Sequence, residues 1–505
     1  MRGIALAQPA RTSVVHQDRR YVGSKETLGY ILFDVAGGFN ISDYGERYIY
    51  DVLKIDLSLL AIVNGINSVW DIVNDTFIGT IVDKTRTRWG KFKPYLMITA
   101  VPGTLLGCLG WLMPYMFNQD PMNMAKFGMY LALAMIGEGL GTFRGISVGG
   151  YLAAITPHPV DRTRLIMLTQ LLSGFFGEQI PGILMGVFID LINNKVVKWS
   201  MRGTYVKMGL FTTLVSGTTA LFFLFISRER VVQSVKTPSI MQTLKSVANN
   251  KPLMIAIISE CLSNFKIGVN KTNYYIDVLG AASIKNIVGI PGGLTSSLSF
   301  LYVPWARRVF STKLLWIVGG SFSEFLMALV FFFGSIGGKG EKGWYRDIWK
   351  MIPILTIQEF LANGVLGIKR IIPTEIFNES LDYCEWKNGY RTEGVTTVAK
   401  GFANKILGSI MNTIKPLWLK ALGYDMTRAF GKQDESTKYL LFAFCTIVPF
   451  LTSLIGVIPK AFYPLTGKKR EAMYEELLAR RSAKNRELSN AGTDKPEQQG
   501  SECGQ

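Results

Sequence analysis

Apolar runs long enough to cross a lipid bilayer recur along most of the chain, separated by short polar segments. A helix of about 20 apolar residues spans the hydrocarbon core of a bilayer, and about twelve such runs are present. They lie near 27–50, 57–82, 94–117, 125–154, 165–193, 204–227, 252–278, 284–304, 313–334, 347–372, 394–422 and 438–460. The pattern predicts an all-α polytopic membrane protein with about twelve transmembrane helices.

The net charge of +18 comes from lysines and arginines that gather between the apolar runs. With the N-terminus inside, most of these basic segments are cytoplasmic, as the positive-inside rule requires. The segments are 84–93, 157–164, 228–251, 305–312, 373–393 and the tail after Lys460. The outer segments 195–203 and 335–346 are basic too, so the bias is not absolute. Because no soluble basic face is present, we expect a lipid bilayer and not nucleic acid as partner.

The long polar connection at 228–251 predicts a joint between two halves of the chain. We therefore expect a cytoplasmic N-terminal segment, two six-helix bundles around the joint, and a cytoplasmic tail. Their ranges are 1–26, 27–227, 252–460 and 461–505. Residues 471–488 predict a short charged helix in the tail, and 489–505 a disordered end.

The rest of the composition argues against an enzyme or a secreted protein. Five scattered cysteines have no metal-ligand spacing and imply no disulfide framework. The only histidines, His16 and His158, fall at the predicted cytoplasmic edge, and no nucleophile–base pair is legible. Residues 1–26 lack the apolar core of a signal peptide. We expect no cofactor.

Two predicted helices carry polar groups that lipid would not accept. Asp34, Asp43, Glu46 and Arg47 interrupt the first apolar run, so this helix should line a cavity. Asp71 and Asp75 in the second run are four residues apart and share a helix face, with Asn74 beside them. Because a carboxylate at bilayer depth costs a few kcal/mol, such a pair predicts a functional site.

The residues around this pair carry a family resemblance. The sequence reads Asp71-x-x-Asn74-Asp75-x-x-x-Gly79-x-x-x-Asp83-Lys84-Thr85-x-Thr87-Arg88-Trp89-Gly90-Lys91-x-Lys93-Pro94. It closely resembles the signature of the glycoside–pentoside–hexuronide:cation symporters, the melibiose-permease branch of the major facilitator superfamily. A second family signature is similar to residues 382–394, and a third to the loop 156–164. The resemblance implies the major-facilitator fold with two six-helix halves.

The resemblance also implies a site for the coupling cation. Counting back from the 156–164 loop, Thr142 falls where the family places a threonine near its cation. Asp71, Asn74, Asp75 and Thr142 would then surround a monovalent cation, Na⁺ or H⁺, with oxygen atoms. We favour Na⁺, because the neutral oxygens of Asn74 and Thr142 are not needed to bind a proton. The alternative is that these groups pair only with one another or with Arg144 as a structural network.

The sugar site departs from the family pattern. The sugar-binding aspartate of the family falls here on Gly145, and its arginine falls on Gln170. Either the substrate differs, or other polar groups in predicted spans bind it; for each of them a structural ion pair is the alternative. The candidate substrate residues are Asp34, Glu138, Arg144, Gln170, Lys266 and Lys405, the last at the position of the family's eleventh-helix lysine.

Two further features concern packing and conformational change. Glycines at 137, 139, 141, 145, 149 and 150 predict a close approach of neighbouring helices to the fourth span. The alternating charges of the second signature suit a cytoplasmic latch with the first. Its predicted members are Asp83, Arg88, Arg162, Asp382, Glu385 and Arg391. An exposed charged loop with no such role is the alternative.

We therefore expect a monomeric symporter that takes up a small sugar-like solute, such as a glycoside, pentoside or uronide. The expected location is the bacterial cytoplasmic membrane, with both termini cytoplasmic. One alternative is a divergent carrier of a lysolipid or an organic anion. A membrane sensor or scaffold is another, but it would need a soluble output domain, and the predicted tail is short and polar.

The predicted topology can be tested by cysteine labelling. Single cysteines placed at 84–93 or 373–393 in a variant without the native cysteines should react with an impermeant maleimide only from the cytoplasmic side. Everted and right-side-out vesicles provide the comparison. Labelling of either segment from outside would overturn the span assignment.

Overall fold

The computed structural model describes residues 22–85, 87–156, 164–166, 168–169, 172–227, 229, 250–388, 393–428 and 431–493. Within these ranges the regular structure is helical, apart from one bridge between Thr87 and Gly90. The all-α prediction is confirmed. Unit 1 comprises Met1–Val235, Tyr275–Asn286 and Asn412–Gln433, and unit 2 comprises Lys236–Tyr274, Ile287–Met411 and Asp434–Gln505. The boundaries of the two predicted six-helix halves stay a prediction.

Seven of the predicted spans are long apolar helices or helix runs in the described part of the chain. They are α3 (Leu57–Lys84), α4 (Lys93–Met116), α5 (Met124–Ile155), α8 (Met201–Ile226), α14 (Thr312–Gly334), α15 with α16 (Ile348–Gly364 and Leu366–Asn388), and α18 to α20 (Glu435–Cys445, Ile447–Ser453 and Val457–Ala461). Polar side chains fix where several of them begin. Asp56 accepts the Ser58 N–H at 2.8 Å before α3, and Asn123 accepts the Lys126 N–H at 3.0 Å near the start of α5.

The other five spans contain shorter or more polar helices. Their elements are α1 (Ser24–Gly38), η1 (Ser42–Tyr44), α2 (Gly45–Arg47), η2 (Tyr48–Leu53), η3 (Ser173–Gln179), α7 (Ile180–Asn193), α10 (Lys251–Asn264), α11 (Lys271–Asp277), α12 (Ile284–Leu298), α13 (Val303–Val309) and α17 (Glu393–Ala421). In the first span, Asn40 ends α1 by donating to the Gly38 carbonyl at 3.0 Å and accepting the Ser42 N–H at 2.9 Å. These side-chain hydrogen bonds of Asn40 replace the backbone hydrogen bonds that would continue the helix.

The break between α10 and α11 has its own backbone partners in unit 2. The Ile267 N–H donates to Thr452 Oγ1 at 3.2 Å, and the Val269 N–H donates to the Phe444 carbonyl at 3.3 Å. Irregular backbone at membrane depth is tolerated only where protein groups satisfy it in this way. The break places Lys266 outside a regular helix.

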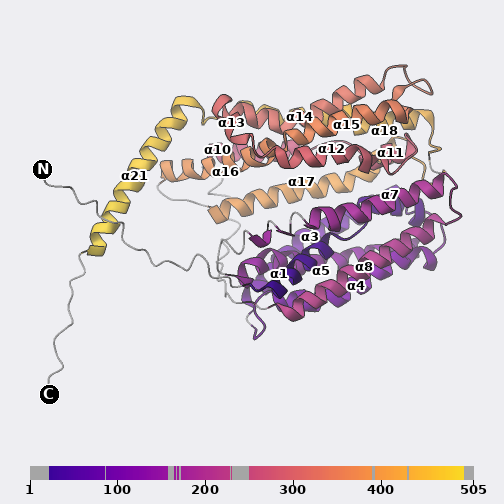
Figure 1. Ribbon diagram of the computed structural model, residues 1–505, viewed down its shortest axis with the longest axis horizontal. Helices are drawn as coiled ribbons and strands as arrows, with labels where there is room; N and C mark the ends of the chain where they lie inside the picture. Colours follow the sequence, from indigo (N-terminus) through magenta and orange to yellow (C-terminus); the bar gives the residue numbers. More distant parts are fainter. Residues whose placement is uncertain are drawn as a thin grey trace. The chain divides into compact units, whose positions relative to one another are not determined.

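In unit 1, α4 packs against α5 and α8, and α1 packs against α8 (Figure 1). The buried Phe223 ring lies at the centre of this packing, 4.9 Å from the Phe33 ring and 6.0 Å from the Tyr151 ring. Helix α3 lies against α5 on its other side. This arrangement turns the polar face of α3 toward α5.

In unit 2, α14 packs against α15, α16 and α19 around a core that includes Trp316 and Tyr463. Helix α21 (Gly467–Thr493) contacts α16. Glu379 of α16 accepts from Arg470 Nε at 2.5 Å, and Glu476 accepts from Trp386 Nε1 at 2.6 Å. The predicted helix at 471–488 is thus part of a longer one. The prediction of disorder is wrong for 489–493, and 494–505 lie outside the described residues.

A buried charge network holds together three segments of unit 1. Arg47 is 1% exposed and contacts Asp51 at 2.9 Å, Asp277 in a short ion pair, and Tyr424 Oη at 2.7 Å. Tyr424 in turn donates to Asp277 at 3.0 Å. Other residues of the first span, among them Phe33, Gly37 and Asn40, line a cavity of unit 1, as expected for this span.

Arg47→Ala should destabilise the protein strongly, because it leaves two carboxylates buried without their cation. The expected cost is about 3–5 kcal/mol, measured as a loss of thermal stability in detergent. Lys285→Ala is the matched control. It removes an ion pair with Asp43 in the same unit whose side chains are 35% and 60% exposed, and should cost at most about 1 kcal/mol. Equal losses in the two variants would contradict the structural role of the network.

Candidate functional site

An oxygen cluster lies where α3 and α5 pack together. Thr142 Oγ1 of α5 is 2.9 Å from Asn74 Oδ1 and 3.2 Å from Asp75 Oδ1 of α3. A hydroxyl has a single proton, so it can donate to only one of these two acceptors. Asn74 and Thr142 are buried, 3% and 8% exposed. The structure thus brings together three of the four residues predicted for the cation.

Residues one turn away extend this polar contact between α3 and α5. Asn67 Nδ2 donates to Glu138 Oε2 at 3.3 Å, and Trp70 Nε1 donates to the Met135 carbonyl at 2.9 Å. Asp71, half-buried, lies on α3 between these groups and Asp75. Glu138, predicted as a substrate residue, is therefore held against α3, one helical turn before Thr142.

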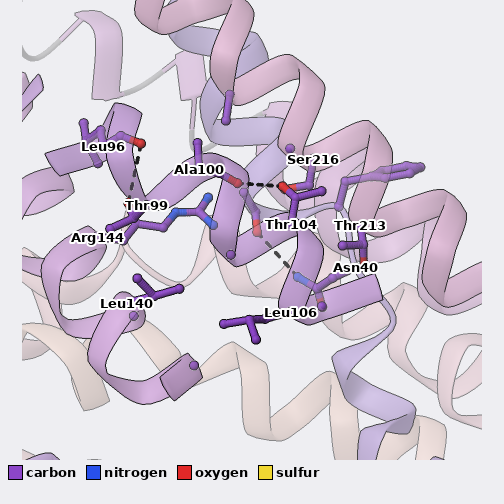
Figure 2. A pocket seen from close by; sticks show the side chains of 18 of the residues that line it. Asn40, Leu96, Thr99, Ala100, Thr104, Leu106, Leu140, Arg144, Thr213 and Ser216 are labelled. Carbon is purple, nitrogen blue, oxygen red and sulfur yellow. Dashed lines mark hydrogen bonds between the residues drawn. The ribbon is translucent and has the colours of Figure 1, made fainter. Parts of the chain in front are cut away.

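A cavity of unit 1 lies among α1, α4, α5 and α8, with a volume of about 470 Å³. Figure 2 shows the Arg144 side chain reaching into it from α5. Several hydroxyl side chains line the cavity, and some bond back to their own helix: Thr99 Oγ1 donates to the Tyr95 carbonyl at 2.7 Å and Thr104 Oγ1 to the Ala100 carbonyl at 2.8 Å. The lone pairs of these oxygens remain available as acceptors.

Glycines help to create this space. A Cβ added at Gly137 or Gly141, both in the wall of the cavity, would meet no atom of the described residues within 4 Å. Among these residues, the predicted close approach of helices to the fourth span is not found at 137, 139, 141, 145 or 149. It is right at Gly150, where a Cβ would lie 2.2 Å from the Phe92 ring. A wall without side chains leaves room for a ligand.

Arg144 has no ion pair or hydrogen bond with any residue that the structure describes. A guanidinium carries five donors in a fixed planar arrangement and is always charged. In a protein interior such a group favours an anionic or oxygen-rich partner. The structural alternative for the cation site, a network that includes Arg144, gains no support from its position.

The remaining substrate candidates lie on other elements. Asp34 lies on α1, and its backbone carbonyl accepts from Ser173 Oγ at 3.1 Å. Lys266 lies in the α10–α11 break of unit 2 and forms a short ion pair with Glu324. Lys405 lies half-buried on α17 in the same unit. Gln170 falls outside the described residues.

The predicted latch is described only in part. Arg88 lies over the ring of Trp89, 4.8 Å from its centre, in unit 1. Asp382 and Glu385 lie on α16 in unit 2, and Asp382 accepts from Tyr474 Oη at 3.4 Å. The Asp83 side chain, Arg162 and Arg391 are outside the described residues. The latch stays a prediction.

Sequence reasoning missed Glu229, which anchors the basic loop of the first signature. Its carboxylate accepts the backbone N–H groups of Lys91, Phe92 and Lys93 at 2.7, 2.8 and 2.5 Å, at the start of α4. A carboxylate is favoured at this helix end by charge as well as by hydrogen bonding. The available signal was a single acid between two arginines directly after an apolar run.

Comparison with known proteins gives consistent likenesses. The sequence profile of a family described as MFS/sugar transport protein matches residues 27–467. The isoprimeverose transporter of Lactiplantibacillus pentosus is 25% identical over 89% of this chain and 90% of its own length. The glucuronide carrier protein homolog of Escherichia coli K12 is 24% identical over 92% and 97%. The crystal structure of the nucleoside transporter NupG matches with a TM-score of 0.52 at 12% identity, over 89% of this chain and 98% of that chain, a likeness of fold alone.

Gly90→Ala should damage the anchored loop for two reasons. Gly90 has a φ of +113°, and an added Cβ would lie 2.3 Å from the Glu229 carboxylate. We expect a loss of about 1–3 kcal/mol in stability. Gly110→Ala in α4 is the control, since a Cβ there meets nothing within 4 Å and helix propensity favours alanine. Thermal unfolding in detergent measures both, and an undestabilised Gly90→Ala protein would refute the anchoring role.

Proposed function

Because the chain belongs to the MFS/sugar transport protein family, we propose that it is a cation-coupled symporter that takes up a sugar-like solute by alternating access. The family resemblance carried by residues 69–94 is confirmed, as is the major-facilitator fold. The protein is an integral membrane transporter. The observation that carries the coupling proposal is the buried contact of Thr142 with Asn74 and Asp75.

The chemistry of this cluster suits a small hard cation. Its atoms are carboxylate, amide and hydroxyl oxygens, the ligands that such cations prefer. The Thr142 hydroxyl lies within hydrogen-bond distance of oxygens of both Asn74 and Asp75, and Asp71 adds a second carboxylate one turn away. A monovalent cation would relieve the repulsion between the carboxylates. Sodium is our preferred ion, because a proton would need only one carboxylate.

The solute is proposed to bind in the Arg144 cavity of unit 1. Threonine and serine oxygens in its wall can accept from sugar hydroxyls, and Arg144 can donate to sugar oxygens. The named substrates of two relatives, isoprimeverose and a glucuronide, support a sugar-like solute. Arg144 would then replace the aspartate that the family carries at the position of Gly145.

Coupling requires only that the cation-loaded protein binds the solute more tightly than the cation-free protein. Linkage is reciprocal, so the solute must then raise the affinity for the cation by the same factor. Within the same fold, a carrier of an organic anion is the second candidate. The observation that favours it is the absence of a described ion-pair partner for Arg144.

Asp75→Cys should abolish concentrative uptake while the protein still inserts in the membrane, because the coupling cation loses a charged ligand. Uptake of labelled isoprimeverose and of a labelled glucuronide into vesicles measures this, with Na⁺ or choline outside at fixed pH. Downhill exchange should survive, since the solute contacts lie elsewhere.

Glu341→Gln is the matched control, an exposed acid in the 335–346 segment. It should transport normally. Accumulation by Asp75→Cys against a gradient with undiminished cation dependence would refute the coupling role. Equal uptake in Na⁺ and choline, with dependence on a pH gradient, would assign the proton as coupling ion.

A further inference from the structure

A second cavity lies within unit 2 and is lined by lysines. Its volume is about 210 Å³, and the residues that matter in its wall are Glu260, Lys266, Trp316, Lys369, Phe377 and Lys460. Lys266 comes from the α10–α11 break, Lys369 from α16 and Lys460 from α20. We call this space the lysine cavity. It has room for roughly seven waters at about 30 Å³ each, enough for an acid group with the carbons next to it.

The acids near the lysine cavity are already engaged. Glu324 forms its ion pair with Lys266. Both oxygens of Glu260 contact α17: Oε1 accepts from Asn404 at 3.0 Å, and Oε2 pairs with Lys400 at 2.8 Å. Each of these two carboxylates therefore neutralises one lysine other than Lys369 and Lys460.

Lys369 and Lys460 are the two lysines of the cavity without a carboxylate partner among the described residues of unit 2. Neither forms an ion pair with any residue in the described part of unit 2. Lys460 is only 3% exposed, and its Nζ lies 3.5 Å from the Trp316 carbonyl and 5.5 Å from the centre of the Trp316 ring. A carbonyl and an aromatic ring stabilise an ammonium group but do not cancel its charge. Three lysines and one carboxylate, Glu260, lie in the wall of the cavity, so the wall carries an excess of two positive charges.

We propose that the lysine cavity is a second solute site, separate from the Arg144 cavity, which binds the carboxylate, sulfonate or phosphate group of an acidic solute through Lys369 and Lys460. The proposal rests on the proposed transport function and narrows its solute to an acidic sugar derivative. Ammonium groups are compact point charges on flexible stems, which suits acid groups of differing shape. The aromatic side chains of Trp316 and Phe377 give the wall apolar faces beside the charge.

The test compares a neutral and an acidic solute with the same ring, methyl glucoside and methyl glucuronide. Counterflow into proteoliposomes is the assay, because it needs no cation gradient. The wild type should prefer the glucuronide. Lys369→Met should raise the KM for the glucuronide about ten- to a hundredfold and leave counterflow of the glucoside unchanged. Lys369→Arg, which keeps the charge, should restore most of the preference.

Lys350→Met, an exposed lysine paired with Asp347 at the start of α15, is the control and should transport like the wild type. Lys460→Met should raise the KM for the glucuronide in the same way as Lys369→Met. If the Lys460→Met protein fails to fold, the comparison of Lys369→Met with the wild type tests the proposal alone. Equal losses for both solutes would assign Lys369 a structural role and overturn the proposal. Equal transport of both solutes by the wild type would overturn it while sugar transport stands. Transport of neither would refute the sugar-transport function itself.

A lipid headgroup or a free anion offers the same chemistry. Thermal stabilisation of the wild type by the glucuronide, by inorganic phosphate and by phosphatidylglycerol distinguishes these sources. Stabilisation by the glucuronide that is lost in Lys369→Met supports the proposal. Stabilisation by phosphatidylglycerol or phosphate alone, unaffected by the glucuronide, would overturn it.

Discussion

The Arg47 guanidinium lies almost wholly away from water, and three segments of unit 1 meet around it. A charge in such a place is tolerated only if its donors are paired, and here Asp51, Asp277 and Tyr424 all contact it. Because Asp277 and Tyr424 lie 230 and 377 positions away from Arg47, the network fixes the segments 275–286 and 412–433 within unit 1. Glu229 follows the same rule at the start of α4, where one carboxylate is matched by three backbone N–H groups.

The requirement that a buried charge be paired separates the structural charges of the molecule from the functional ones. Arg47 is buried and paired with Asp51, Asp277 and Tyr424, so its role is structural. Arg144 lies in a cavity, and so do Lys369 and Lys460. None of these three has an ion-pair partner in the described part of the chain. A protein that keeps such cations bears a cost in stability, and a ligand that supplies the missing negative charge or oxygen atoms removes it.

The sequence was sufficient for features that depend on local periodicity. The spacing of Asp71, Asn74 and Asp75 put them on one helix face, and the family resemblance then added Thr142, which the structure places beside Asn74 and Asp75. Features that depend on distant partners could not be predicted. No local pattern pairs Arg47 with Asp277, or Glu229 with the Lys91–Lys93 backbone. The close helix approach predicted from the glycines of α5 also depends on distant partners. A glycine permits either close packing, as at Gly150, or open space, as at Gly137 and Gly141. Only the neighbours decide which.

Helix α5 connects the two proposed sites of unit 1. Thr142 and Arg144 are two residues apart, which turns their side chains by about 200° around the helix axis. One therefore faces α3 and the cation cluster, and the other faces the cavity among α1, α4 and α8. A cation that draws α3 and α5 together at Thr142 acts on the same rigid element that carries Arg144. Because a packed helix moves as a unit and does not bend one residue at a time, a small shift at one face changes the geometry at the other. Coupling between cation and solute then needs no relay of side chains, only a helix with one ligand on each face.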